Sequence, residues 1–124
     1  MTTTPEGRVA AALRQAVIEA GGEIRKLRWE GRNGAPDYFV LFHGRIFLIE
    51  CKAPGQRPRA SQMLEFERLL AQDIMVLILD KAEEAKTLIN LLFTETLPTA
   101  DVWDVKARRY YSIKDYFFTN YRKK

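Results

Sequence analysis

The sequence is poor in cysteine and has no long apolar run. Its single cysteine, Cys51, excludes an internal disulfide, as is usual for proteins of a reducing cytoplasm. Every apolar run is far shorter than the ~20 residues that a membrane-spanning helix needs. The threonine-rich start leads into a charged helix rather than a signal peptide, and no repeat or low-complexity tract is seen. We therefore expect a cytoplasmic protein with one domain.

Apolar residues are plentiful enough for a core. The 124 residues are 47% hydrophobic, which argues against long disordered spans. The net charge of +4 and the pI near 9.3 suit an acidic partner such as nucleic acid, but they equally describe an ordinary basic protein. The distribution is more informative, because basic residues precede and follow the stretch between residues 34 and 62.

The order of apolar patterns predicts an α/β fold. Thr4 and Pro5 indicate the start of a helix that continues to about residue 20. Aromatic and β-branched runs between turn residues predict strands. The expected strands are 24–29, 38–42, 46–51, 74–79 and, less regular, 102–105; the expected helices are 58–72, with Leu64, Phe66, Leu69 and Leu70 inward, and 81–93. The strand–helix–strand order over 46–79 predicts a right-handed βαβ crossover.

A turn at residues 43–44 joins two of these strands and predicts a tight antiparallel hairpin. Pairing of Phe42 with Arg45 sets the register of the whole hairpin. A two-residue or four-residue loop gives this register, and a three-residue loop would break it. Asp37 then lies opposite Glu50, at the end of the hairpin away from the turn.

Asp37, Glu50 and Lys52 would form a group of charges at that end. Two carboxylates directly opposite each other lie roughly 5 Å apart at Cβ and repel. A divalent cation removes the repulsion, and Mg²⁺ is usually held by one or two carboxylates with waters and substrate phosphates. Lys52 shares the strand face of Glu50, so its ammonium would stabilise developing negative charge or orient a water. Such a group suits hydrolysis of a phosphodiester.

An ordinary structural explanation of the same residues stays open. Acidic residues at strand ends are usually solvated, and Glu50 with Lys52 would then be a surface ion pair worth ~0–1 kcal/mol. Against this, Glu50 follows an apolar run and precedes a stretch expected to be buried, where an idle charge is costly. Spacing alone does not decide between the two.

Three elements occur in order along the chain: Pro36-Asp37, then Glu50-Cys51-Lys52, then Gln62 on the following helix. With these spacings the sequence resembles the VRR-NUC domain, a branch of the PD-(D/E)xK nuclease superfamily, in its small stand-alone phage form. The likeness covers about residues 4–80. Members of the family often have glycine near position 73, where this chain has Asp73.

The resemblance implies a restriction-endonuclease-like fold, with a central mixed sheet flanked by helices. It implies a metal-dependent DNA endonuclease. Branched or structured DNA is one candidate substrate, and a nicked duplex or a sequence-specific site stays open. Asp37 and Glu50 would be ligands of Mg²⁺ or Mn²⁺, and the main-chain carbonyl of Cys51 would be a third ligand.

Three further side chains take roles from the same resemblance. Lys52 would activate or orient the attacking water, and Gln62 would help to position the water or the phosphate beside it. Glu6 would lie near the metal. Gln62 is otherwise an exposed helix residue, and Glu6 is otherwise an acid favoured in the first turn of a helix.

The expected contacts with DNA come from arginines on either side of the motif: Arg28, Arg32, Arg57 and Arg59. Arg32 lies in a glycine-rich loop that would suit a phosphate. The resemblance also implies a homodimer and a bacterial or phage-infected host cell. The alternative is a non-catalytic DNA-binding or phage accessory protein that keeps the fold, which the complete motif set argues against.

The ends of the chain are less informative. We expect a single domain over residues 1–124, with its core over about 4–93 and a C-terminal extension over 94–124. Aromatic and basic residues alternate over 110–121, which suits packing or dimerisation and also DNA stacking. The Cys51 thiol is expected on the strand face opposite Glu50, as a small buried hydrophobe.

Overall fold

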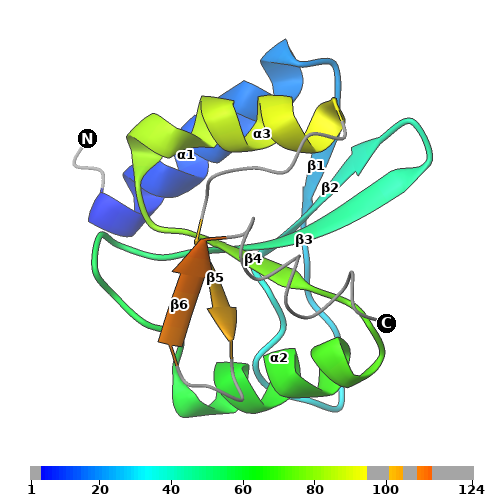
Figure 1. The fold of residues 1–124 in the computed structure, drawn as a ribbon, viewed down its shortest axis with the longest axis vertical. Coiled ribbons are helices and arrows are strands. Elements are labelled where there is room, and N and C mark those ends of the chain that lie inside the picture. Colours follow the sequence, from blue (N-terminus) through cyan, green and yellow to red (C-terminus); the bar gives the residue numbers. More distant parts are fainter. Residues whose placement is uncertain (1–3, 95–100, 105–108, 113–124) are drawn as a thin grey trace.

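The computed structural model describes residues 4–94, 101–104 and 109–112 (Figure 1). In chain order the elements are α1 (Pro5–Glu19), β1 (Glu23–Lys26), β2 (Tyr38–Phe42), β3 (Arg45–Cys51), α2 (Ala60–Ala71), β4 (Val76–Leu79), η1 (Ala82–Glu84), α3 (Ala85–Phe93), β5 (Asp101–Asp104) and β6 (Arg109–Ser112). The predicted α/β class is confirmed. No helix in the described ranges is long and apolar enough to cross a bilayer.

Four strands form the central sheet in the order β1-β2-β3-β4. β1, β2 and β3 are antiparallel neighbours, while β3 and β4 are parallel and α2 connects them. α1 and α3 lie on one face of the sheet and α2 lies on the other (Figure 1). β5 and β6 form a separate antiparallel pair, and the backbone of β5 lies beside β4.

The hairpin between β2 and β3 has the predicted register. Phe42 pairs with Arg45 and Phe39 pairs with Leu48. The connecting residues His43 and Gly44 have φ values of +44° and +82°. Two consecutive positive φ values are typical of the two-residue hairpin turn whose twist matches that of the strands. This turn fixes which residues stand opposite each other at the far end of the hairpin.

Alternation along β3 and β4 separates two apolar clusters. Ile49 and Cys51 point to the α1 and α3 face, where they join the larger core. Leu48 points to the α2 face and contacts the smaller cluster around Phe66. Because side chains alternate along a strand, Glu50 lies on the α2 face between these apolar neighbours. Cys51 is 1% exposed on the opposite face, as predicted.

The inward face of α2 differs from the prediction at one position. Leu64 is 56% exposed, whereas Glu65 is buried beside Phe66. Leu69 and Leu70 are half-buried, so the expectation for Leu64 was wrong and the rest of the stripe is correct. The helix is rotated by about one residue because Gln62 in its first turn faces the sheet, and residues three and four later share that face.

α2 ends in a residue with left-handed backbone at position 73, where the sequence resemblance implies glycine. Asp73 has φ of +61°. Its N–H donates to Leu70 O, and the N–H of Ile74 donates to Leu69 O, each at 2.9 Å. These two bonds are the signature of a Schellman motif, in which glycine is the usual residue at this position. The motif occupies residues 73 and 74, so β4 begins two residues later than predicted.

Other boundaries also differ. β1 ends at Lys26, so residues 27–29, which were predicted to continue this strand, lie outside it. The predicted helix over 81–93 begins with the 3-10 turn η1, and α2 begins two residues later than expected. β5 overlaps the expected strand over 102–105 and stops at Asp104. Val105 and the aromatic positions beyond Ser112 lie outside the described residues.

Candidate active site

A polar cavity of about 350 Å³ lies where β3 ends and where α2 begins. Its lining residues are Glu6, Asp37, Glu50, Lys52, Gln56, Arg57, Arg59 and Gln62. The first turns of α1 and α2 both contribute to this wall, and helix N-termini favour anions. All five predicted catalytic side chains therefore border a single cavity.

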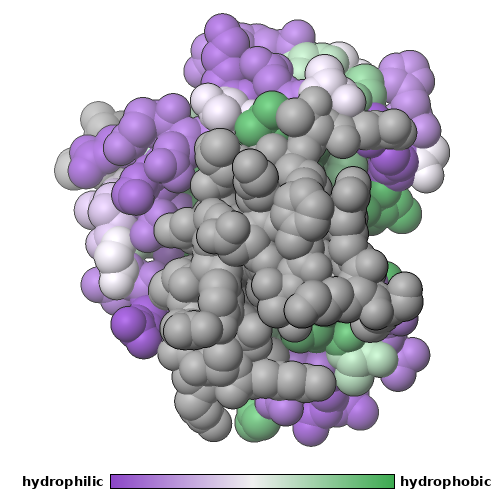
Figure 2. Space-filling view, in the orientation of Figure 1, coloured by the Kyte–Doolittle hydropathy of each residue, from purple (hydrophilic) through white to green (hydrophobic). Residues whose placement is uncertain are grey.

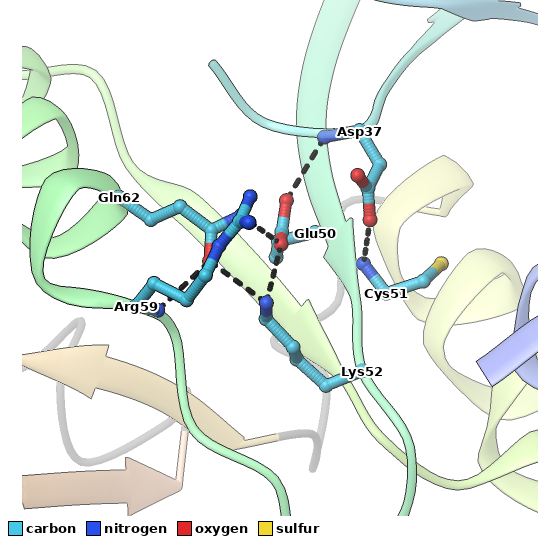
Figure 3. A network of polar contacts seen from close by, with 6 residues as sticks. All are labelled: Asp37, Glu50, Cys51, Lys52, Arg59 and Gln62. Atoms are coloured by element: carbon cyan, nitrogen blue, oxygen red, sulfur yellow. Dashed lines mark hydrogen bonds and ion pairs between the residues drawn. The ribbon is translucent and has the colours of Figure 1, made fainter. Parts of the chain in front are cut away.

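Asp37 and Glu50 are joined through the backbone as well as by proximity. The Asp37 N–H donates to Glu50 Oε1 at 3.0 Å, and the Cys51 N–H donates to Asp37 Oδ2 at 2.9 Å (Figure 3). The Asp37 carbonyl accepts from the N–H of Leu27 at 2.8 Å. Each carboxylate thus accepts a hydrogen bond from the main chain of the other segment: Asp37 from β3 and Glu50 from the residue before β2. These bonds restrict how either carboxylate can rotate.

Glu50 is a buried carboxyl with a strongly raised pKa. It is 1% exposed, and its pKa is raised to about 7: burial is the largest cause, the charge of Asp37 acts in the same direction, and Lys52 and Gln62 oppose the shift. Desolvation disfavours the charged form of a carboxyl, and a neighbouring like charge acts in the same direction. The surface ion pair considered from the sequence is therefore excluded for Glu50 and Lys52.

Lys52 and Gln62 complete a buried polar network with Glu50 (Figure 3). Lys52 Nζ lies 3.1 Å from Glu50 Oε2 and donates to Gln62 Oε1 at 2.7 Å. Gln62 Nε2 donates to Glu50 Oε2 at 2.5 Å. Lys52 and Gln62 are 8% and 3% exposed, so the ordinary explanation of Gln62 as an exposed helix residue is wrong.

The other predicted residues divide into two groups. Glu6, Arg57 and Arg59 line the cavity, whereas Arg28 and Arg32 are exposed and are not part of its wall. The edge of the molecule where α1 begins and where the β3–α2 loop runs is hydrophilic (Figure 2). The Cys51 thiol faces the apolar core, and burial raises its pKa far above the ordinary value.

Two residues near the site escaped the sequence prediction. Gln56 lines the cavity from a turn in which its N–H donates to Ala53 O and Gly55 has φ of +78°. Pro54 followed by a positive-φ glycine is a type II turn signal, which fixes the loop but says nothing of the direction of Gln56. Glu65 is 4% exposed and follows Gln62 by one helical turn.

Gly34 brings the loop before Asp37 against the first turn of α2. Its φ is +94°, and a Cβ atom there would lie 2.5 Å from Ser61 O and 2.9 Å from Gln62 Cα. Both atoms belong to the backbone, so they cannot move as a side chain would. The close approach of this loop to α2 sets the distance between Asp37 and the elements that carry Gln62.

The Gly34→Ala variant is expected to lose about 2 kcal/mol more unfolding free energy than Gly31→Ala. Gly31 has a similar φ of +83°, but a Cβ there meets open space. The control therefore carries the backbone strain without the collision. Urea unfolding of both variants measures the difference, and equal losses would show that the loop is not tightly held by α2.

Comparison with known proteins bears on this site. No family model matches the chain. The chain is 41% identical over 68 residues to "Putative nuclease p44" of Acyrthosiphon pisum secondary endosymbiont phage 1. The matched residues are 54% of this chain and 73% of that protein. Among solved structures it is similar to a chain described as "VRR_NUC domain", with 34% identity and a TM-score of 0.64. That similarity covers 71% of this chain and 97% of the other.

Proposed function

The chain belongs to the VRR-NUC family, and from this we propose that it is a nuclease, more specifically a metal-dependent endonuclease that hydrolyses phosphodiester bonds in DNA. The observation that carries the proposal is the convergence of Asp37, Glu50, Lys52 and Gln62 on one cavity. The cavity can hold a phosphoryl group together with its counter-ion. The two carboxylates suit the cation, and the buried ammonium and the helix N-termini suit the phosphoryl oxygens.

The donor set fits a hard divalent cation, for which we propose Mg²⁺ or Mn²⁺. Asp37 uses Oδ2 for the Cys51 N–H, and Oδ1 makes no hydrogen bond to the described residues. Glu50 is buried with a raised pKa, and a cation beside it would favour the charged form. Asp37 and Glu50 would hold the ion with the carbonyl of Cys51. In the described ranges no group of three or more His, Cys, Asp or Glu side chains is placed to hold a metal ion, so waters and substrate oxygens would complete its shell.

A bound metal ion would supply stabilisation of negative charge on the phosphoryl oxygens and a more acidic water. The residues of the chain do the rest. Lys52 holds a positive charge at the cavity wall, where charge develops on the phosphate. Arg57 and Arg59 line the same cavity and would contact the DNA backbone. The exposed Arg28 and Arg32 would extend these contacts outside the cavity.

The proposal includes branched or structured DNA as the substrate, the cytoplasm as the place of action, and a homodimer as the active form. The family supports these points, and the basic residues around the cavity support DNA as the substrate. Light scattering of the purified protein tests the dimer, and a panel of flap, fork, junction and linear duplex oligonucleotides tests the preferred DNA structure.

Wild-type protein is expected to cleave supercoiled plasmid with Mg²⁺ or Mn²⁺ and to be inactive in EDTA. Asp37→Asn should cleave about a hundredfold more slowly, because it weakens the metal site. A matched control is Asp80→Asn, since Asp80 accepts the Gly55 N–H outside the cavity. A folded wild type that binds DNA in a salt-sensitive way but cuts none of the substrates with either metal would favour the non-catalytic DNA-binding protein.

A further inference from the structure

The amide of Gln62 is almost fully used by the protein itself. Its Oε1 accepts from Lys52 Nζ at 2.7 Å and from the Arg59 N–H at 2.9 Å, while its Nε2 donates to Glu50 Oε2 at 2.5 Å. An amide oxygen has two lone pairs, so no acceptor capacity remains for the proton of a water. Gln62 therefore does not orient an attacking water as an acceptor.

The ammonium of Lys52 is held from two sides. One N–H points to Glu50 Oε2 at 3.1 Å and another points to Gln62 Oε1. An ammonium group has three N–H donors, and Lys52 is part of the cavity wall. Two fixed partners set the rotation of the group and leave its third N–H for the cavity.

We propose that Gln62 is a positioning residue for Lys52: together with Glu50 it fixes the ammonium so that its third N–H meets the reacting phosphate or the attacking water. That the third N–H meets a phosphate or a water rests on the proposed function. That Gln62 and Glu50 fix the ammonium is a property of the metal-free protein and does not depend on the proposed function.

A neutral amide is suited to this place for electrostatic reasons. A carboxylate in place of the Gln62 amide would face Glu50 and add a third negative charge beside those of Glu50 and Asp37. An apolar side chain would leave Lys52 with one partner and would leave the Arg59 N–H without its acceptor. The orientation of the amide is also unambiguous, because a flipped group would set its NH₂ against the ammonium.

The anchoring of Gln62 reaches into the backbone. The bond from the Arg59 N–H to Gln62 Oε1 is one half of a capping box at the start of α2, and Arg59 makes no side-chain cap itself. The backbone of Gln62 lies against Gly34, where a Cβ atom would be 2.9 Å from Gln62 Cα. The side chain that holds Lys52 is thus fixed at both its amide and its backbone.

The test compares Gln62→Met with Gln15→Met in metal-free protein. Gln15 is an exposed helix residue whose amide donates to Glu19, so its variant removes a glutamine without touching the cavity. In ¹⁵N NMR, we expect the Lys52 ammonium to give a signal protected from exchange in wild type and Gln15→Met. The signal should be lost in Gln62→Met. It should also be lost in Gln62→Ala, which removes the amide without placing a larger apolar group beside the buried charges and serves if the methionine variant fails to fold.

Kinetics add a second measurement. Gln62→Met is expected to lower kcat about thirtyfold and to leave KM for DNA within about twofold, since residues that orient a catalytic group typically contribute 10- to 100-fold. An unchanged Lys52 signal in folded Gln62→Met would overturn the proposal, as would a tenfold rise in KM with unchanged kcat. If wild type proves inactive on DNA, the proposed function fails, and the NMR comparison still decides the role of Gln62.

Discussion

Replacing Lys52 with methionine is expected to slow DNA cleavage about a thousandfold, because removal of one preorganised donor at a reacting centre typically costs 10²–10³ in rate. Methionine keeps most of the side-chain length and removes only the charge and the donors. Arg57 and Arg59 line the same cavity but are exposed, so solvent screens their charges and they cannot replace a buried ammonium.

The same substitution also affects stability, and the two effects must be separated. Lys52 forms a buried ion pair with Glu50, and loss of one partner from such a pair costs up to about 3–5 kcal/mol. Protonation of Glu50 lowers this cost at neutral pH, because its pKa is already raised to about 7. Cleavage should therefore be measured well below the unfolding temperature of the variant, with folding checked by circular dichroism.

Lys81→Met is the matched control for the charge. Lys81 pairs with Glu84 at 3.8 Å, and both side chains are about half-exposed. Its loss should leave the cleavage rate unchanged within twofold and the unfolding free energy within about 0.5 kcal/mol. Cleavage by Lys52→Met at more than a tenth of the wild-type rate would contradict the role given to the ammonium.

The part of the site that depends on local geometry could be predicted from the sequence. The turn at residues 43–44 sets the hairpin register, and strand alternation then places Glu50 and Cys51 on opposite faces. The structure has this register, and the Asp37 N–H contacts Glu50 directly. These relations involve neighbouring strands joined by a two-residue turn, so no long-range information was needed.

The part that depends on tertiary packing could not be predicted in the same way. Apolar periodicity placed Leu64 inward, yet Glu65 is buried and Leu64 is exposed. The phase of α2 follows from the orientation of Gln62 into the site, since positions three and four later share its face. Had the predicted role of Gln62 been used to set the helix phase, Glu65 would have been identified as inward in place of Leu64, beside the correctly predicted Phe66.

Loops were the weakest element of the prediction. Arg28 and Arg32 were expected to contact DNA, which stays a prediction; both are exposed, and the structure places neither in the cavity wall. Gln56 lines it instead, from a turn whose bounds the sequence indicates through Pro54 and Gly55. Side-chain direction in a loop depends on its anchors, here the bond from Gly55 to Asp80, which no sequence period encodes.

In EDTA, the unfolding free energy contributed by Glu50 is expected to fall by about 3 kcal/mol between pH 4.5 and pH 8. Its pKa is about 7 in the folded chain against an ordinary value of 4.5. Below pH 4.5 both states are protonated, so the contribution is fully present. As pH rises through the window, the unfolded chain loses its proton first, and above pH 7 the folded chain carries a buried charge.

Urea unfolding across this pH range gives the unfolding free energies of wild type and Glu50→Gln. The change with pH in the difference between these two free energies measures the effect. Glu84→Gln is the matched control, because Glu84 is about half-exposed; its difference from wild type should stay within about 0.5 kcal/mol at every pH. Mg²⁺ or Mn²⁺ should restore wild-type stability at pH 8, with a gain that rises as the logarithm of its concentration above Kd, and should leave Glu50→Gln largely unaffected. Parallel pH profiles for wild type and Glu50→Gln would show that Glu50 ionises as an ordinary carboxyl. In that case a cation would not be needed to offset its burial.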